Sequence, residues 1–442
     1  MVYLLFFCSG LSGLIYQVVW VRVFGNVFGN TVYSTSLVVA VFMLGLGAGS
    51  YIVGGWADRR YSAQPDSLLS AYGYLELVIG GMGFGISTLL PHLGQASALV
   101  TSYARDANGW YILSAPSYLA RAGIAVILLT PITLLMGGTL TLLIRHLVRS
   151  DLDLGGRRIA MLYAVNTAGA ALGCFLTDFQ LVPAFGLRGT QLVAVFFNIV
   201  AAVGAFAVAR SVRPKPDATA EKKGKRRVPV PPDVRRSVRL QPDVVSQPSA
   251  LSPLAVPLTS LALAMSGFAA MGMEILWFRH VSILLGGFRA VFSLLMTVIL
   301  AGIGAGSLAS GLLFRRTRMP AQWLMVVQGL FVAFALLGLA AADASSIERA
   351  VMADRAYQAV ESGLARTFNE LWFNARPILL EVGLPALLMG FSFPLANAIT
   401  QRADRSVGRR AGVLYFSNTC GAVCRPILSG SPAQCSDAER IA

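Results

Sequence analysis

Long apolar stretches recur along nearly the whole chain, separated by short polar segments, and no other feature constrains the fold as strongly. A helix needs about 20 consecutive apolar residues to cross the hydrocarbon core of a bilayer. Hydrophobic residues make up 55% of the chain, charged residues make up 13%, and the mean hydropathy is +0.65. This composition leaves too little polar surface for a water-soluble protein of such length. The sequence therefore predicts an all-α integral membrane protein.

About eleven membrane spans are predicted, the first six before a polar linker and the rest after it. The predicted spans cover residues 3–28, 32–56, 68–91, 120–145, 160–184, 188–209, 256–284, 290–313, 321–342, 372–400 and 411–424. We accordingly expect four segments: a first membrane repeat over 1–210, a basic disordered linker over 211–252, a second, truncated membrane repeat over 253–424, and a polar tail over 425–442.

The distribution of lysine and arginine predicts the orientation of the chain in the membrane. Short loops rich in these residues stay in the cytoplasm, and here they all fall on one side of the predicted spans. The N-terminus and the linker are therefore expected to be cytoplasmic, with the spans in the plasma (inner) membrane. The linker is read as a solvated connector, or alternatively as a segment attracted to anionic lipids. These loops account for the net charge of +15, so no nucleic-acid partner is indicated.

An internal repeat relates the two sets of spans. Ser9–Gly10 aligns with Ser266–Gly267, and Gly45–Ser50 aligns with Gly302–Ser307 at the same offset. The copies begin an even number of helices apart, so they have the same orientation, as in the parallel repeats of major facilitator (MFS) transporters. The glycines spaced within these stretches let membrane helices approach closely, so we interpret them as packing residues rather than as a phosphate-binding loop.

Several segments of the first repeat carry a more specific resemblance. At residues 14–22, 45–50, 134–140 and 162–170 the chain resembles the membrane part of the fused MFS/spermidine synthase-like family. The resemblance implies a role connected with polyamines. It also implies a soluble aminopropyltransferase-like domain after the membrane part. The sequence does not contain that domain, so we do not expect the chain to be catalytic alone.

The segment Gly54–Arg59 resembles the cytoplasmic signature of MFS transporters between their second and third helices. The resemblance implies that Gly54, Asp58 and Arg59 form a cytoplasmic gating motif. In the second repeat, Arg315 stands where the matching aspartate would be.

Acidic residues within predicted spans are candidate solute ligands, because a charge at the middle of a membrane helix costs about 2.5 to 3.5 kcal/mol. Glu76 and Glu381 lie near the middle of their spans, and the repeat aligns Gln328 with Glu76. Two interpretations stay open. These acids form a cation or proton site in the cleft between the halves, or each is a neutral acid hydrogen-bonded between helices.

Other polar residues within the spans complete the candidate set. Glu274 aligns with Gln17, and Asp178, like Glu274, lies nearer the predicted outer face, where a structural role is favoured. Four further residues occupy matching positions in the two repeats: Arg22, Arg279, Asn166 and Asn418. The arginines bind an anionic group or extend toward the interface, and the asparagines line a path or tie helices together by hydrogen bonds.

The cysteines and histidines indicate neither a metal site nor a catalytic dyad, and no cofactor is predicted. The expected partners are the lipid bilayer and a small cationic solute. The favoured hypothesis is a transporter-like module that handles polyamines or another small cation by alternating access. The alternatives are the membrane anchor of a spermidine synthase without its catalytic domain, and an inactive fragment.

Overall fold

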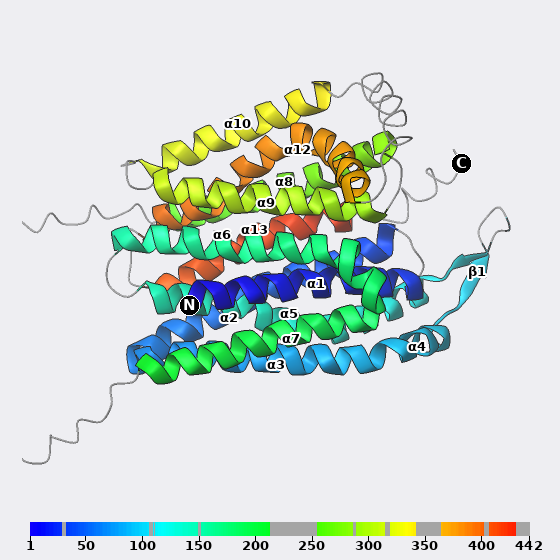
Figure 1. The fold of residues 1–442 in the computed structure, drawn as a ribbon, viewed down its shortest axis with the longest axis horizontal. Helices are drawn as coiled ribbons and strands as arrows, with labels where there is room; N and C mark the ends of the chain where they lie inside the picture. Colours follow the sequence, from blue (N-terminus) through cyan, green and yellow to red (C-terminus); the bar gives the residue numbers. More distant parts are fainter. Residues whose placement is uncertain are drawn as a thin grey trace, which may run out of the picture.

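The structure, a computed structural model, describes residues 1–28, 32–105, 109, 111–148, 152–212, 254–285, 289–313, 319–341, 364–401 and 406–429. Most of these residues belong to long helices that run side by side in an elongated bundle (Figure 1). A short antiparallel hairpin of β1 (Tyr103–Arg105) and β2 (Tyr111–Leu113) extends from one end of the bundle (Figure 1).

The helices before the linker are α1 (Val2–Phe28), α2 (Val32–Ala63), α3 (Leu68–Leu89), α4 (Leu93–Leu99), α5 (Ala115–Leu147), α6 (Leu152–Leu176) and α7 (Val182–Val212). Short 3₁₀ turns at Pro65–Ser67 and Leu90–His92 flank α3, and a π-helical turn at Thr177–Leu181 joins α6 to α7. The helices after the linker are α8 (Ala255–Leu285), α9 (Arg289–Leu313), α10 (Pro320–Ala341), α12 (Leu364–Gln401) and α13 (Val407–Ser429).

A long helix stands at every predicted span, so the prediction of a helical bundle is confirmed. Nine helical segments of the described residues are long and apolar enough to cross a membrane, and one of them contains both α6 and α7. These segments are compatible with a membrane protein. Some helix ends differ from the prediction: α2 continues to Ala63, and α5 begins at Ala115 after an N-cap at Ser114. At these ends the helix continues through polar residues beyond the apolar stretch, and hydropathy does not detect them.

The helices pack in corresponding pairs before and after the linker. In the first half, meaning residues 1–212, α1 packs on α6 and α2 packs on α5. In the second half, meaning residues 254–429, α8 packs on α13 and α9 packs on α12. Between the halves, α2 packs on α13 and α6 packs on α9. Each pair has its counterpart at the position that the sequence repeat aligns.

Glycines allow the closest of these crossings, as the sequence predicts. A Cβ atom on Gly49 in α2 would overlap the backbone of Leu134 in α5, and one on Gly306 in α9 would overlap the backbone of Leu387 in α12. Both glycines lie in the aligned stretches, and both contact partners are aligned as well. The packing role predicted for them is therefore confirmed.

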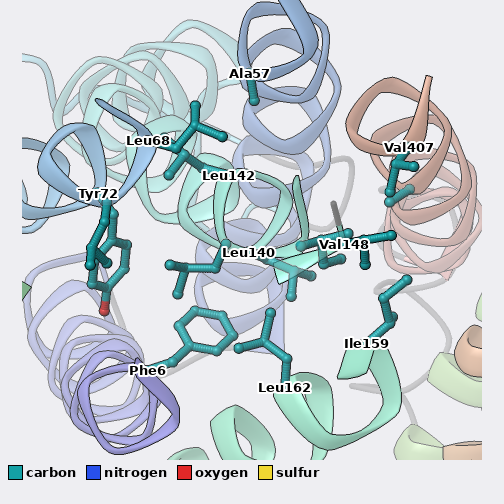
Figure 2. Packing of buried hydrophobic residues seen from close by; sticks show 14 of the residues in the cluster. Phe6, Ala57, Leu68, Tyr72, Leu140, Leu142, Val148, Ile159, Leu162 and Val407 are labelled. Carbon is teal, nitrogen blue, oxygen red and sulfur yellow. The ribbon is translucent and has the colours of Figure 1, made fainter. Parts of the chain in front are cut away.

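The hydrophobic core differs between the two ends of the bundle. We call the end where α2 ends and α13 begins the inner end, because its loops are predicted to be cytoplasmic, and the opposite end the outer end. At the inner end, Phe6, Leu140 and Leu162 of the first half share one buried cluster with Val407 of the second half (Figure 2). Toward the outer end, each half has a large buried cluster of its own, one around Trp20 and one around Trp277, and Phe179 of the first half packs against the second.

Candidate functional site

Asp58, near the end of α2, joins the two halves at the inner end. Its Oδ1 accepts a hydrogen bond from the backbone N–H of Gly408 at 3.0 Å, and its Oδ2 accepts one from the N–H of Arg409 at 2.8 Å. These N–H groups belong to the first turn of α13, where no intrahelical acceptor is available. A carboxylate is favoured at this end of a helix because the helix dipole is positive there. Asp58 is thus a cap for a helix of the other half.

Arg145 of α5 holds the same carboxylate from the first half. Its Nε lies 3.0 Å from Asp58 Oδ1, its guanidinium stacks 3.8 Å from the ring centroid of Tyr61, and its Nη1 donates to the carbonyl of Val148 at 3.2 Å. With these contacts the arginine fixes the direction in which Asp58 points. Sequence reasoning missed Arg145 as a partner of the motif, although it is a basic residue at the inner end of a span.

The other residues of the predicted gating motif lie in two different environments. Gly54 packs so closely on the backbone of Gly408 that any side chain would overlap it. Arg59 is exposed and forms no hydrogen bond or ion pair with the described residues. Arg315, which aligns with Asp58 in the second repeat, lies outside the described residues. Gly54 and Asp58 are thus the motif residues with a described contact to the second half.

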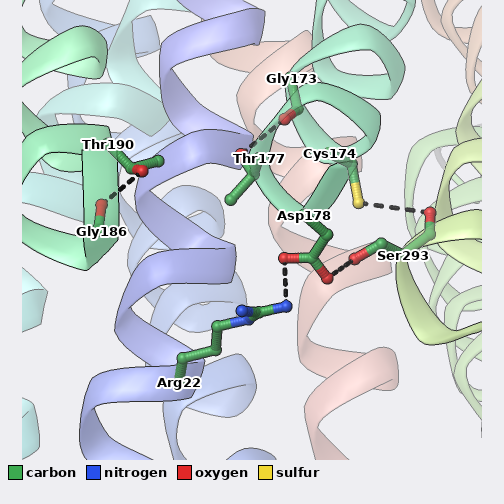
Figure 3. Close-up of polar contacts among 8 residues, drawn as sticks. All are labelled: Arg22, Gly173, Cys174, Thr177, Asp178, Gly186, Thr190 and Ser293. Atoms are coloured by element: carbon green, nitrogen blue, oxygen red, sulfur yellow. Dashed lines mark hydrogen bonds and ion pairs between the residues drawn. The ribbon is translucent and has the colours of Figure 1, made fainter. Parts of the chain in front are cut away.

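A second polar bridge between the halves lies at the π-helical turn after α6. Asp178 in this turn forms an ion pair with Arg22 of α1 at 2.5 Å and accepts a hydrogen bond from Ser293 Oγ of α9 (Figure 3). The Asp178 side chain is only 3% exposed, so its charge depends on these partners. Asp178 thus links two helices of the first half to α9 of the second half.

Cys174, one turn before Asp178, contacts the same helix of the second half. Its Sγ lies 3.7 Å from the backbone carbonyl of Ser293, the residue whose side chain binds Asp178 (Figure 3). Cys174 also forms a small buried cluster with Val18 of α1 and Met296 of α9. Apolar and polar contacts between the halves therefore meet around this turn.

Glu274 of α8 lies near this bridge, and the described residues include no polar partner for it. It is half-buried and close enough to Cys174 for the two side chains to interact electrostatically. No hydrogen bond or ion pair joins its carboxylate to any residue that the structure describes. Gln17, its aligned counterpart, is buried on α1, and Arg279 is exposed. Glu274 is thus a carboxylate near the contact between the halves.

Glu76 lies inside the first half and not in a cleft between the halves, where the cation-site hypothesis placed it. Its carboxyl group is fully buried, and its Oε2 accepts a hydrogen bond from Asn198 Nδ2 of α7 at 2.7 Å. The hydroxyls of Ser9 and Tyr72 also face this group. These contacts match the alternative interpretation, an acid hydrogen-bonded between helices.

Glu381 of α12 forms a polar pair within the second half. Its Oε1 and Oε2 lie 2.9 and 3.1 Å from His280 Nδ1 of α8. The His280 side chain is 26% exposed and the Glu381 side chain 6% exposed. The sequence analysis assigned no site to the histidines and did not pair His280 with Glu381. Hydropathy contains no signal for a pair formed between residues so far apart in the chain.

The remaining aligned polar residues tie helices together within each half. Asn166 Nδ2 donates to the carbonyl of Phe6 at 3.1 Å, and its backbone packs against Gly10. Asn418 packs against Gly267, the residue that the repeat aligns with Gly10. Gln328, the counterpart of Glu76, donates to the hydroxyls of Ser266 at 3.1 Å and Ser392 at 2.8 Å.

Among the residues that the structure describes, no group of histidine, cysteine, aspartate or glutamate side chains could hold a metal ion. The polar contacts between the halves described above are those of Asp58 at the inner end and those of Asp178 nearer the outer end, together with hydrogen bonds to backbone carbonyls. The Ser293 hydroxyl contacts the Asp178 carboxylate, which also pairs with Arg22, and among the described residues no polar partner is found for the carboxylate of Glu274.

Comparison with known proteins gives a partial relationship. No protein-family profile matches the chain. A polyamine aminopropyltransferase of Corynebacterium efficiens is 28% identical over 198 residues, which cover 43% of this chain and 32% of that protein. Polyamine aminopropyltransferase 1 of Streptomyces coelicolor is 27% identical over 199 residues, which cover 45% of this chain and 32% of that protein. The similarity thus spans about a third of the length of these relatives and is weak.

Proposed function

We propose that this chain is a transporter-like membrane module in which two halves of MFS type move a small organic cation by alternating access. The observation that carries the proposal is the matched contact between the halves. Ser50 Oγ of α2 donates to the carbonyl of Gly412 in α13 at 3.3 Å, and Ser307 Oγ of α9 donates to the carbonyl of Ala160 in α6 at 2.9 Å. The sequence repeat aligns Ser50 with Ser307 and Gly412 with Ala160, so a two-fold axis along the membrane normal would relate the two contacts.

The difference between the two ends supports a rocking motion. The inner end is held by a large shared hydrophobic core and by Asp58, whereas toward the outer end each half has a large core of its own and the halves meet at the small cluster of Val18, Cys174 and Met296. A change of state would require the inner contacts to open while the outer clusters approach each other. In this proposal, Asp58 favours the state that is closed toward the cytoplasm.

The charge of the site supports a cationic solute. Glu274 has no partner among the described residues, and the Asp178 carboxylate nearby is neutralised by Arg22. A free carboxylate within the membrane region attracts a cation strongly because the surroundings have a low dielectric constant. Polyamines are the favoured class because the two relatives are named polyamine aminopropyltransferases.

A second candidate function rests on the same relatives. The chain would then be the membrane part of a protein that acts on polyamines through a separate aminopropyltransferase domain. The similarity to two aminopropyltransferases favours this alternative, and it requires no movement of solute through the bundle. Fold alone does not decide between the two functions.

Binding of radiolabelled spermidine to the purified protein tests the proposed site. We expect saturable binding that Glu274→Gln weakens at least tenfold, because the amide cannot pair with an ammonium group. Asp66→Asn, which removes an exposed carboxylate at the inner end, should bind as the unmodified protein does. Binding lost in Glu76→Gln but retained in Glu274→Gln would place the site inside the first half and contradict the proposal.

A further inference from the structure

A surface pocket at the inner end, separate from the contacts between the halves, has a lining that suits an anionic amphiphile. The pocket has a volume of about 730 Å³ and lies where the end of α2, the beginning of α3 and the end of α7 meet. Its lining includes Arg60 and Arg210, the aromatic side chains of Trp56, Tyr74 and Phe206, and the hydroxyl of Ser67. All of these residues belong to the first half.

The charge of the pocket is positive. Arg60 and Arg210 are both exposed, and no aspartate or glutamate is among the lining residues. Arg60 is held in place because its Nε donates to Ser67 Oγ at 3.0 Å. Asp66 precedes Ser67 in the chain but does not line the pocket. A guanidinium is a preferred partner of a phosphate group.

The walls of the pocket are apolar and aromatic. Tyr74 packs edge-on against Phe206 with 4.9 Å between ring centroids, and Tyr74 remains 63% exposed. Trp56 is 39% exposed on the neighbouring helix. Tyrosine and tryptophan with exposed faces are typical of the headgroup level of a bilayer, where one part of the ring contacts acyl chains and another contacts water.

We propose that this pocket binds one anionic phospholipid of the inner leaflet, with the headgroup phosphate at Arg60 and Arg210 and an acyl chain along Tyr74 and Phe206. Basic pockets between membrane helices on the cytoplasmic side bind anionic headgroups, and a zwitterionic lipid would gain less from two arginines. The site is distinct from the proposed solute site, because neither Glu274 nor Asp178 lines it. Its occupancy would tie α7, and hence the start of the linker, to α2 and α3.

Native mass spectrometry of the purified full chain tests this site. The protein is titrated with phosphatidylglycerol or phosphatidylcholine, and the bound lipids are counted. We expect one tightly bound phosphatidylglycerol, and about fivefold weaker binding for each arginine removed, or about thirtyfold for Arg60→Gln with Arg210→Gln. The matched control is Arg157→Gln, which removes an exposed arginine at the inner end of α6, outside the pocket.

Two further measurements test the proposal if the double variant does not fold. Arg210→Gln alone changes an exposed residue in the last turn of α7 and should lose about fivefold, even if the double variant does not fold. Glycerol phosphate, which carries the headgroup chemistry without acyl chains, should not displace the lipid at equal concentration. Equal affinity of the unmodified protein and Arg210→Gln for phosphatidylglycerol, equal affinity for phosphatidylcholine, or displacement by glycerol phosphate would each overturn the proposal.

Discussion

Replacing Asp58 with asparagine should release the first turn of α13. In the protein, the Asp58 carboxylate accepts hydrogen bonds from the N–H groups of Gly408 and Arg409 at 3.0 and 2.8 Å. Asparagine has one carbonyl oxygen, so it can keep one of these bonds and must lose the charge that the helix dipole favours. Arg145 also loses its ionic partner and keeps only its contacts with Tyr61 and Val148.

The size of the effect follows from these contacts. A hydrogen bond to a charged group contributes about 1.5 to 3 kcal/mol, and a charge at the end of a helix adds about 0.3 to 1 kcal/mol. Losing one bond and the charge should therefore cost about 2 kcal/mol or somewhat more. That free energy corresponds to a roughly thirtyfold larger population in which the α2–α13 contact is open.

Hydrogen–deuterium exchange measured by mass spectrometry reads this population directly. Because opening precedes exchange, the amides of Gly408 and Arg409 should exchange about thirty times faster in Asp58→Asn. Arg59→Gln, which changes the neighbouring exposed residue, should exchange as the unmodified protein does, and so should peptides from α6 in both variants. Exchange within twofold of the unmodified protein, in a folded Asp58→Asn variant, would refute the assignment of Asp58 as the cap that joins the halves.

Three further predictions concern thermal stability, measured in detergent. Gly49→Ala should destabilise the protein by about 1 to 3 kcal/mol because its Cβ would overlap the backbone of α5. Gly13→Ala, where nothing lies within 4 Å, should leave stability unchanged or raise it. A change of the same sign in both variants would contradict the close contact of α2 with α5 at Gly49. Asp178→Asn should lower the free energy of unfolding by about 3 to 5 kcal/mol because it leaves Arg22 without its counter-charge. The same substitution should cost less stability in an Arg22→Gln background, and additive effects of the two substitutions would argue against the ion pair. Glu76→Gln, which keeps an acceptor for its partner on α7, should change stability by less than about 1 kcal/mol, whereas Glu76→Ala should cost about 2 to 5 kcal/mol; equal losses would contradict the hydrogen-bonded role.

The sequence predicts the helices well because hydropathy reports directly on which segments are long and apolar. It predicts poorly which face of each helix points into the bundle, because lipid is as apolar as a protein interior and no polar face marks the exposed side. Glu76 illustrates this limit: its depth in the span is evident from the sequence, but its position between α1, α3 and α7 depends on how α3 is rotated.

The sequence also does not predict which polar side chains contact one another. The repeat aligns Asn166 with Asn418, and each of these residues packs against a glycine that the repeat also aligns. It contains no information on contacts that only one copy makes. The pair of Glu381 with His280 and the bond from Ser293 to Asp178 are of this kind, and they arise from packing between distant helices.

Uptake of labelled putrescine and spermidine into proteoliposomes tests the central claim most directly. The unmodified chain, shown to be folded, is compared with Glu274→Gln, with Asp66→Asn as the matched control and with empty liposomes. The account predicts saturable uptake of at least one of the two polyamines by the unmodified chain and by Asp66→Asn, and a loss of uptake in Glu274→Gln. No uptake above empty liposomes from folded protein would contradict transport by this chain and favour the role of a membrane part for a polyamine-modifying enzyme.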